Sequence, residues 1–271
     1  MLKKVPSAYG WCRTRWSWAP LAAQLRVQRG ITVSSSTVRR WLHGLGWVWK
    51  RAQWVARDDD PERVEKLARI CHTRDTRGKR AIMLCADERD IHLLPKVGYQ
   101  WLPTGETVKI VTPGQNQKYY LAGALEPKSG RIVACTSPRK TNVRFRALLD
   151  PLEELYPKAR FDKVCVVVDH YGIHKAKAVE RWLAAHPRFE LLCLPSYCPQ
   201  ANPIERAFGH VHDKCTRNHK CQRIEDLVSD VECHLLANGP WKYKLSQVYY
   251  TPAVTAAVER ITTEQQLLQA A

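Results

Sequence analysis

The chain has 271 residues, 45% of them hydrophobic, and a formal net charge of +17. It can therefore bury a sizeable core, and its charge far exceeds what solubility requires, which points to a polyanionic partner such as nucleic acid or an acidic membrane surface. No long apolar stretch and no secretory signal is present, and the ten cysteines are scattered through apolar segments. The composition predicts a cytoplasmic protein without a membrane span and without disulfides.

The positive charge is concentrated at the start of the chain. Residues 1–57 contain eleven Lys and Arg residues and no Asp or Glu, so eleven of the seventeen net charges lie there. This asymmetry marks a separate basic module, for which double-stranded DNA is the favoured partner.

Two amphipathic helices are predicted inside this module. Segment 17–30 begins with a capping serine and ends with a glycine, and segment 31–47 spaces Val38, Trp41, Leu42 and Leu45 along one stripe that we expect to be buried. A short β wing is expected at 46–51, and most of the seven tryptophans of the module are expected in its core. The module is thus a winged or simple helix-turn-helix. Its candidate DNA contacts are Ser35, Ser36, Arg39, Arg40, His43, Lys50 and Arg51.

The rest of the chain alternates between strand and helix patterns. A linker helix is predicted over 58–78, followed by an α/β domain over 79–240 and a C-terminal tail over 241–271. Within the domain, apolar β-rich runs at 81–87, 107–113, 118–125 and 131–137 predict an antiparallel meander. Strands at 163–170 and 189–196 then alternate with helices at 141–156, at 174–186 and from 203 onward.

Three acidic residues stand where these elements begin or end. Two of the predicted strands look buried and end in an acid, one in Asp87 and the other in Asp169. Pro203 places Glu205 in the first turn of a helix. An acid is buried cheaply only when it is paired or binds a metal, and strand ends are where α/β folds place their sites. We expect the three carboxylates to converge.

Three converging carboxylates repel one another unless divalent cations lie between them. Oxygen ligands of this kind suit Mg²⁺ or Mn²⁺, and two such ions about 4 Å apart can activate a water or 3′-hydroxyl and stabilise the leaving oxygen of a phosphodiester. The sequence predicts a two-metal site made of Asp87, Asp169 and Glu205.

These residues carry a family resemblance. The segments Asp87-Glu88, 98–105, 166–174 and 194–205, with 35 residues between Asp169 and Glu205, resemble the DDE transposases of the mariner superfamily in its bacterial insertion-sequence branch. The resemblance implies an RNase H-like catalytic core, Mg²⁺ dependence, binding of terminal inverted repeats, insertion at TA dinucleotides, work as a homodimer and a nucleoid-associated location. On the quoted motifs, the supporting residues are Glu88, Trp101, His170, His174 and Asn202. Trp101 could stack on a base or pack under its loop.

Two departures from the family pattern define the alternatives. His170 stands where the family has Asn, and Met1 lies almost at the second of two helix-turn-helix modules that relatives carry. One alternative is therefore a truncated or inactive transposase-derived DNA-binding regulator. The other is a stand-alone nuclease with the same metal site.

A cluster of His and Cys residues lies beyond Glu205. His212, Cys215 and His219 share one helix face, so a zinc site is conceivable, although the spacing matches no common zinc pattern. The plainer interpretation is a helix that presents Glu205 and lines the DNA channel.

Overall fold

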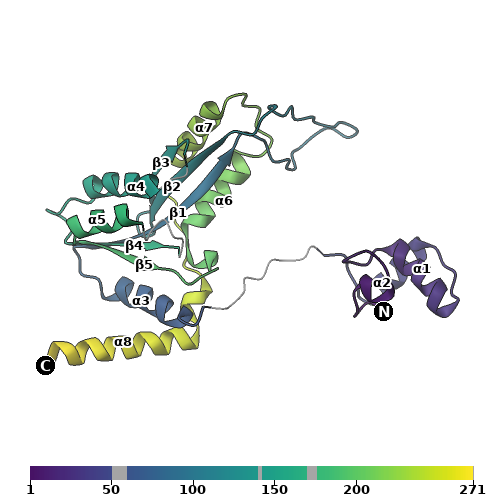
Figure 1. The fold of residues 1–271 in the computed structure, drawn as a ribbon, viewed down its shortest axis with the longest axis horizontal. Coiled ribbons are helices and arrows are strands. Elements are labelled where there is room, and N and C mark those ends of the chain that lie inside the picture. The colour runs from purple at the N-terminus through teal and green to yellow at the C-terminus, as the bar shows by residue number, and fades with distance from the viewer. Residues whose placement is uncertain (51–59, 140–141, 170–175, 271) are drawn as a thin grey trace. The chain divides into compact units, whose positions relative to one another are not determined.

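The computed structural model describes residues 1–50, 60–139, 142–169 and 176–270 of the chain (Figure 1). The chain divides into two compact units, Met1–Val55 and Ala56–Ala271. Each unit is considered by itself.

The smaller unit is helical. A 3-10 turn, Pro6–Tyr9, precedes α1 (Trp18–Arg29) and α2 (Ser35–Gly44). Gly30 ends α1 in the left-handed region at φ 67, and the Ser34 side chain caps α2 by accepting the Thr37 N–H at 3.1 Å. The core contains Trp16, with smaller apolar groups of both helices around it. The two predicted helices are therefore confirmed.

Two expectations for this unit were wrong. Within the predicted stripe Val38 is buried and Leu42 partly so, but Trp41 and Leu45 are 44% and 73% exposed, because the described unit has no third layer to cover them. Trp47 and Trp49 are also about half exposed rather than core residues. Residues 47–50 form no strand, and Arg51, the last residue of the expected wing, lies outside the described residues.

A five-stranded mixed sheet organises the larger unit, in the order β3-β2-β1-β4-β5. The strands are β1 (Ala81–His92), β2 (Lys118–Glu126), β3 (Arg131–Ser137), β4 (Lys163–Val168) and β5 (Phe189–Cys193). β1, β2 and β3 form an antiparallel meander, whereas β4 runs parallel to β1 and β5 runs parallel to β4. The predicted α/β class is correct.

Helices cover both faces of this sheet (Figure 1). The first face packs on α4 (Asn142–Leu155) and α5 (Lys177–Ala185), with Phe145 and Leu148 buried against Val166. The second face is covered near β4 and β5 by α3 (Arg63–Thr76) and α8 (Pro252–Ala270), and near β1 and β2 by α6 (Ile204–Lys214) and α7 (Ile224–Ala237). Short 3-10 turns lie at Pro199–Ala201 and Gln247–Tyr250.

The segment 241–271, expected as a tail, belongs to the body of this unit. α8 packs along α3, where both ring nitrogens of His72 bond to Thr262 and Gln265 of α8, and Arg260 pairs with Glu65. No local sequence pattern indicates this contact, because the partners are about 190 residues apart.

The strand expected at 107–113 does not form. Val108 and Val111 are exposed at 37% and 75%, and the segment belongs to a long connection between β1 and β2 that pairs with no strand. Apolar β-branched residues are not enough for a strand when no neighbouring edge accepts their backbone groups. β1 is instead longer than expected and continues to His92.

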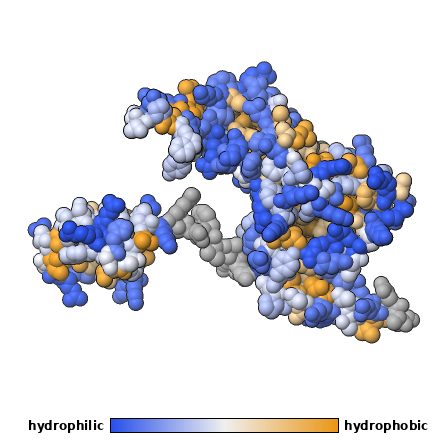
Figure 2. Space-filling model, turned by 180° about the vertical axis from the view of Figure 1, so that it is seen from behind, coloured by the Kyte–Doolittle hydropathy of each residue, from blue (hydrophilic) through white to orange (hydrophobic). Residues whose placement is uncertain are grey.

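The surface of the larger unit is mainly hydrophilic. Figure 2 shows hydrophilic side chains over most of the visible face, with apolar ones in small separate groups. All ten cysteines are free thiols. No helix in the described part of the chain is long and apolar enough to cross a membrane.

Candidate active site

The site lies where β1 changes its pairing. β1 pairs with β4 only as far as Cys85 opposite Val167, whereas its pairing with β2 continues to His92. Asp87 comes two residues after the last β4 pair, so it lies inside β1 and not at its end, as the sequence had suggested. The two strands separate there, which leaves space beside Asp87 for other side chains.

Asp87 is held by two donors of neighbouring segments. Its Oδ1 accepts the Glu88 backbone N–H at 2.7 Å, and its Oδ2 accepts the Asn202 side-chain amide at 3.3 Å. Asn202 is itself only 2% exposed and also donates to the Ala86 carbonyl at 2.9 Å. Burial, and then the negative charges of Glu205 and Asp169, raises the pKa of Asp87 to about 8.

Glu205 is brought to Asp87 by a close helix-sheet contact. Gly123 of β2 lies directly opposite Asp87, and a Cβ there would be 3.1 Å from the Phe208 ring and 3.2 Å from Ile204. Because glycine lacks that atom, α6 can pack tightly on β2 through its buried Ile204 and Phe208. Glu205, next to Ile204 in the first turn, therefore faces the same opening as Asp87.

Among the described residues, the Glu205 carboxylate has a cationic partner in Arg89. Arg89 Nη1 donates to Glu205 Oε2 at 3.3 Å, and both side chains are partly exposed. Arg89 lies two residues after Asp87 on β1, so both project from the same side of the strand. A positive charge thus lies beside the carboxylates.

Asp169 completes the group. It follows β4 directly, and the Val168 carbonyl before it accepts the Leu194 N–H at 2.8 Å. Asp169, Asp87, Glu205 and Asn202 line one cavity of about 420 Å³, whose other wall is the loop 194–199. The structure thus places the three acidic residues named from the sequence around one opening.

The loop 194–199 is fixed by an acidic residue far away in the sequence. Asp60 Oδ2 accepts the Ser196 N–H at 2.8 Å, and the same carboxylate binds Lys66 at 2.9 Å. The Ser196 N–H, with Lys66 and a further backbone donor, lowers the pKa of Asp60 to about 2. Next to Ser196, Tyr197 has a φ of 53 and is 73% exposed at the rim. A bulky residue in the left-handed region marks a loop whose shape is imposed by its surroundings.

Replacing Asp60 by Asn is expected to lower the free energy of unfolding at pH 7 by about 2 kcal/mol, because the pKa of this buried carboxyl is about two units lower in the folded chain. Because the pKa of Asp60 is lower in the folded than in the unfolded chain, its charge stabilises the fold at pH values above the unfolded pKa. The difference in free energy of unfolding between wild type and variant should therefore shrink as the pH falls from about 4 to about 2. Urea unfolding across this range measures it.

Asp162→Asn is the matched control, since Asp162 pairs with Arg80 on the surface with both side chains more than half exposed. It should cost well under about 1 kcal/mol. A deficit of Asp60→Asn that stays constant down to pH 2 would contradict the role given to its charge.

The donor set suits a hard divalent cation. The lining acids offer only carboxylate oxygens. Burial and then the repulsion from Glu205 and Asp169 raise the pKa of Asp87, so a cation between the carboxylates would relieve that repulsion. As they stand, no three His, Cys, Asp or Glu side chains of the described residues are close enough to form a metal site. The chemistry of the donors fits Mg²⁺ or Mn²⁺.

The other residues named in support are dispersed. Glu88 lines a neighbouring cavity of about 300 Å³ with Arg89 and His212. Trp101 is 101% exposed on the long β1–β2 connection, so it does not pack under its loop. His170 and His174 lie outside the described residues.

Two members of the His and Cys cluster beyond Glu205, His210 and Cys221, have partners other than a metal. His210 contacts His234 of α7 at 3.0 Å between ring nitrogens, and Cys221 bonds to Asp230. Burial and nearby cations lower the pKa of His212. Together with the absence of a three-residue group among the described side chains, these contacts do not support a zinc site.

The candidate DNA contacts of the smaller unit lie on one helix face. Ser36, Arg39, Arg40 and His43 of α2 are exposed, Ser35 is half-buried, and Lys50 is exposed after the helix. The Arg39 guanidinium lies over the Trp18 ring at 5.8 Å. α2 thus presents two arginines and short polar groups to solvent.

Two site residues escaped the sequence analysis. No pattern in the sequence singled out Asp60 or Arg89 as a site residue. Their partners, Ser196 and Glu205, are 136 and 116 residues away, so no local pattern could connect them. The only available signal for Arg89 was its same-face spacing from Asp87.

Comparison with known proteins gives consistent matches over both units. A family described as "DDE superfamily endonuclease" matches residues 82–228, and one described as "Winged helix-turn helix" matches residues 13–66. The chain is 36% identical over 251 residues to the "Insertion element IS630 uncharacterized 39 kDa protein" of Shigella sonnei, which covers 92% of this chain and 73% of that protein.

Two solved structures are similar in fold. The Mos1 transposase paired-end complex with left transposon end matches with a TM-score of 0.54 at 19% identity, over 93% of this chain and 78% of that one. The Mos1 mariner paired end complex with Mn gives 0.55 at 19%, over 90% and 72%. The likeness shows the fold predicted from the sequence, a helix-turn-helix region followed by an RNase H-like mixed sheet flanked by helices.

Proposed function

Because the chain belongs to the DDE superfamily endonucleases, as a transposase of the insertion-sequence branch of the mariner superfamily, we propose that it cleaves DNA at the ends of an insertion element and joins the exposed 3′-hydroxyl to target DNA. The observation that carries this proposal is the single opening lined by Asp87, Asp169 and Glu205. Each of these acids comes from a different element of the sheet-helix framework.

Asp87, Asp169 and Glu205 would hold two Mg²⁺ or Mn²⁺ ions. The solved Mos1 complexes with Mn and with Mg support divalent metal use. When bound, such ions polarise the phosphodiester and lower the pKa of the attacking water or hydroxyl.

The chain's own residues orient the reacting groups. Asn202 and the Glu88 N–H fix both oxygens of Asp87, so this carboxylate has one orientation toward the opening. The Gly123 contact fixes the helix that carries Glu205. The loop 194–199, held by Asp60, forms the far wall against which the DNA strand would lie. Such fixed positions supply the alignment that in-line displacement at phosphorus needs.

DNA recognition is proposed for the first domain, residues 1–57. Its contacts would be Ser35, Ser36, Arg39, Arg40, His43, Lys50 and Arg51, with α2 in the major groove of a terminal inverted repeat. The match to a winged helix-turn-helix supports this. Residues 79–240 would form the catalytic domain. Insertion at TA dinucleotides by a homodimer is proposed as well, because the family resemblance of the motifs implies it.

A strand-joining assay tests the proposal. The full chain is incubated with Mg²⁺, a labelled duplex that carries the element end and a supercoiled plasmid, and the label should become covalently joined to plasmid DNA. Cleavage of the duplex without joining would support a stand-alone nuclease instead. Binding without cleavage would support the regulator, and either result would overturn the proposed transposition.

A further inference from the structure

A second large cavity lies at the opposite end of the strands from the three acidic residues. It has a volume of about 700 Å³ and is lined by the start of β1, the β2–β3 turn, the end of α3 and the α4–β4 connection. β1 begins at Ala81 in this cavity and reaches Asp87 six residues later. At about 3.3 Å per residue, the two sites are about 20 Å apart.

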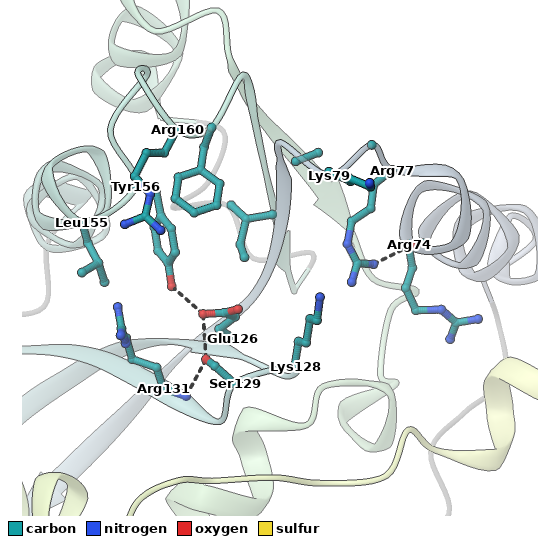
Figure 3. Close-up of a pocket in the computed structure, with 14 residues that line it drawn as sticks. Arg74, Arg77, Lys79, Glu126, Lys128, Ser129, Arg131, Leu155, Tyr156 and Arg160 are labelled. Carbon is teal, nitrogen blue, oxygen red and sulfur yellow. Dashed lines mark hydrogen bonds between the residues drawn. The ribbon is translucent and has the colours of Figure 1, made fainter.

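The cavity is strongly cationic. Its lining contains one acidic residue, Glu126, and Figure 3 shows several of the cationic side chains converging around it. The cationic residues are Arg74, Arg77, Lys79, Lys128, Arg131 and Arg160.

The one carboxylate is engaged by hydroxyl groups. Ser129 Oγ donates to Glu126 Oε2 at 2.7 Å, and the buried Tyr156 hydroxyl donates to the same atom at 3.2 Å. Figure 3 shows both contacts at the floor of the cavity. Glu126 therefore serves to fix the turn and the end of α4, and it makes no ion pair within the described residues.

Most of the positive charge has no acidic partner. Arg74 pairs with Asp75 at 2.6 Å, but Lys79, Lys128, Arg131 and Arg160 form no ion pair with any residue that the structure describes. Like charges gathered in this way repel one another and destabilise the fold unless an anion lies between them.

The segments that carry these cations are held in place. Gly130 has a φ of 78, and the Trp241 N–H donates to its carbonyl at 2.7 Å; a Cβ at Gly130 would meet that nitrogen at 2.7 Å. This fixes the turn of Lys128 and Arg131. On the opposite wall Arg80 binds Asp162 and the carbonyls of the 158–159 segment, which fixes the loop of Arg160. The backbone segments that carry the charges are thus held in place, while the side chains of Lys79, Lys128, Arg131 and Arg160 are exposed.

We infer that this cavity binds the phosphodiester backbone of DNA outside the segment that reacts at the acids. The cations come from three separate segments around a cavity far larger than one phosphate, so they suit successive phosphates of a polyanion. Arg131 and Arg160 have no acidic partner among the described residues, and Arg77 donates to the backbone carbonyl of Arg74. The planar guanidinium group of arginine matches the geometry of a phosphate. We expect these contacts to confer no DNA sequence specificity, since contacts to the DNA backbone carry no sequence information.

If one duplex spans both sites, a separation of about 20 Å corresponds to about six base pairs between this contact and the reacting phosphate. The inference concerns binding only and does not depend on strand transfer. It adds a DNA contact in the larger unit to the one proposed for α2 in the smaller unit.

Salt-dependent DNA binding tests the inference. The full chain is titrated in EDTA with a fluorescent duplex of about 40 base pairs, and the slope of log affinity against log salt is measured. The variant Lys79→Gln/Lys128→Gln/Arg131→Gln should lower the magnitude of the slope by about 2 to 3, since each lost phosphate contact removes about 0.9. The control Arg69→Gln/Arg181→Gln/Lys220→Gln removes three exposed charges outside the cavity and should change it by less than about 1.

Glu126→Gln gives a test of opposite sign, because removing the lone negative charge should tighten DNA binding several-fold, whereas Glu154→Gln, exposed on α4, should not. Equal slopes for the cavity variant and its control would overturn the inference. A second pair of results would also overturn it: inorganic pyrophosphate raises the thermal stability of the wild type but not of the cavity variant, and the DNA salt slopes of the two proteins are the same. That outcome would assign the cavity to a small phosphate compound. None of these readouts requires DNA cleavage, so their failure is distinct from failure of the proposed function.

Discussion

Replacing Asp87 by Asn is expected to reduce Mg²⁺-dependent DNA cleavage by at least about a thousandfold, or about 4 kcal/mol of transition-state stabilisation. The amide keeps the size of the side chain but removes the charge that would bind the cation. A second readout is thermal unfolding, where Mg²⁺ should stabilise the wild type and not the variant. Cleavage rates over a Mg²⁺ and a Mn²⁺ titration measure the first effect.

Asp90→Asn is the matched control for this experiment. Asp90 lies three residues further along β1 and lines the neighbouring cavity, not the one that holds the three acids. It should retain cleavage within a few-fold of the wild type. If a folded Asp87→Asn protein cleaved DNA as fast as this control, the catalytic assignment would be wrong.

The double variant Arg39→Gln/Arg40→Gln is expected to weaken binding of the element end by about 10- to 100-fold, as two guanidinium contacts in a major groove are lost. The salt slope should also decrease by about 2. Because α2 keeps its buried Val38 and its Ser34 cap, the helix itself should persist, which far-ultraviolet circular dichroism can check. Fluorescence anisotropy with specific and scrambled duplexes measures the affinity.

Arg26→Gln/Arg29→Gln provides the comparison for that variant. Both arginines are exposed in the last turn of α1, so the same charge is removed from the same unit. The control should lose affinity for both duplexes equally and by a smaller factor. Equal losses of specificity from the two double variants would mean that α2 is not the recognition helix.

The framework of the larger unit was predictable because its elements have strong local patterns. The apolar run before Asp169 forms β4, and Pro203 precedes α6, so Asp169 and Glu205 lie at element ends as expected. The extension of β1 beyond Asp87 was not predictable, since it depends on pairing with β2 along residues that are only half-buried.

The features that could not be predicted are mostly contacts between residues far apart in the sequence, or the exposure of side chains that no other element covers. The contacts Asp60–Ser196 and His72–Thr262 join segments whose sequences give no hint of each other. The stripe of α2 was read from its spacing, but spacing says which side chains share a face and not whether anything covers them. Trp41 is exposed for that reason.

The contact between Arg89 and Glu205 bears on when the site can assemble. With a guanidinium beside the acids, part of their repulsion is countered by the polypeptide itself, so the chain can reach its native state before any ion arrives. Chelation should then silence the chemistry while leaving the fold intact. The protein would then be folded and bound to its DNA before the reaction begins, and the divalent ion would be needed for catalysis but not for folding.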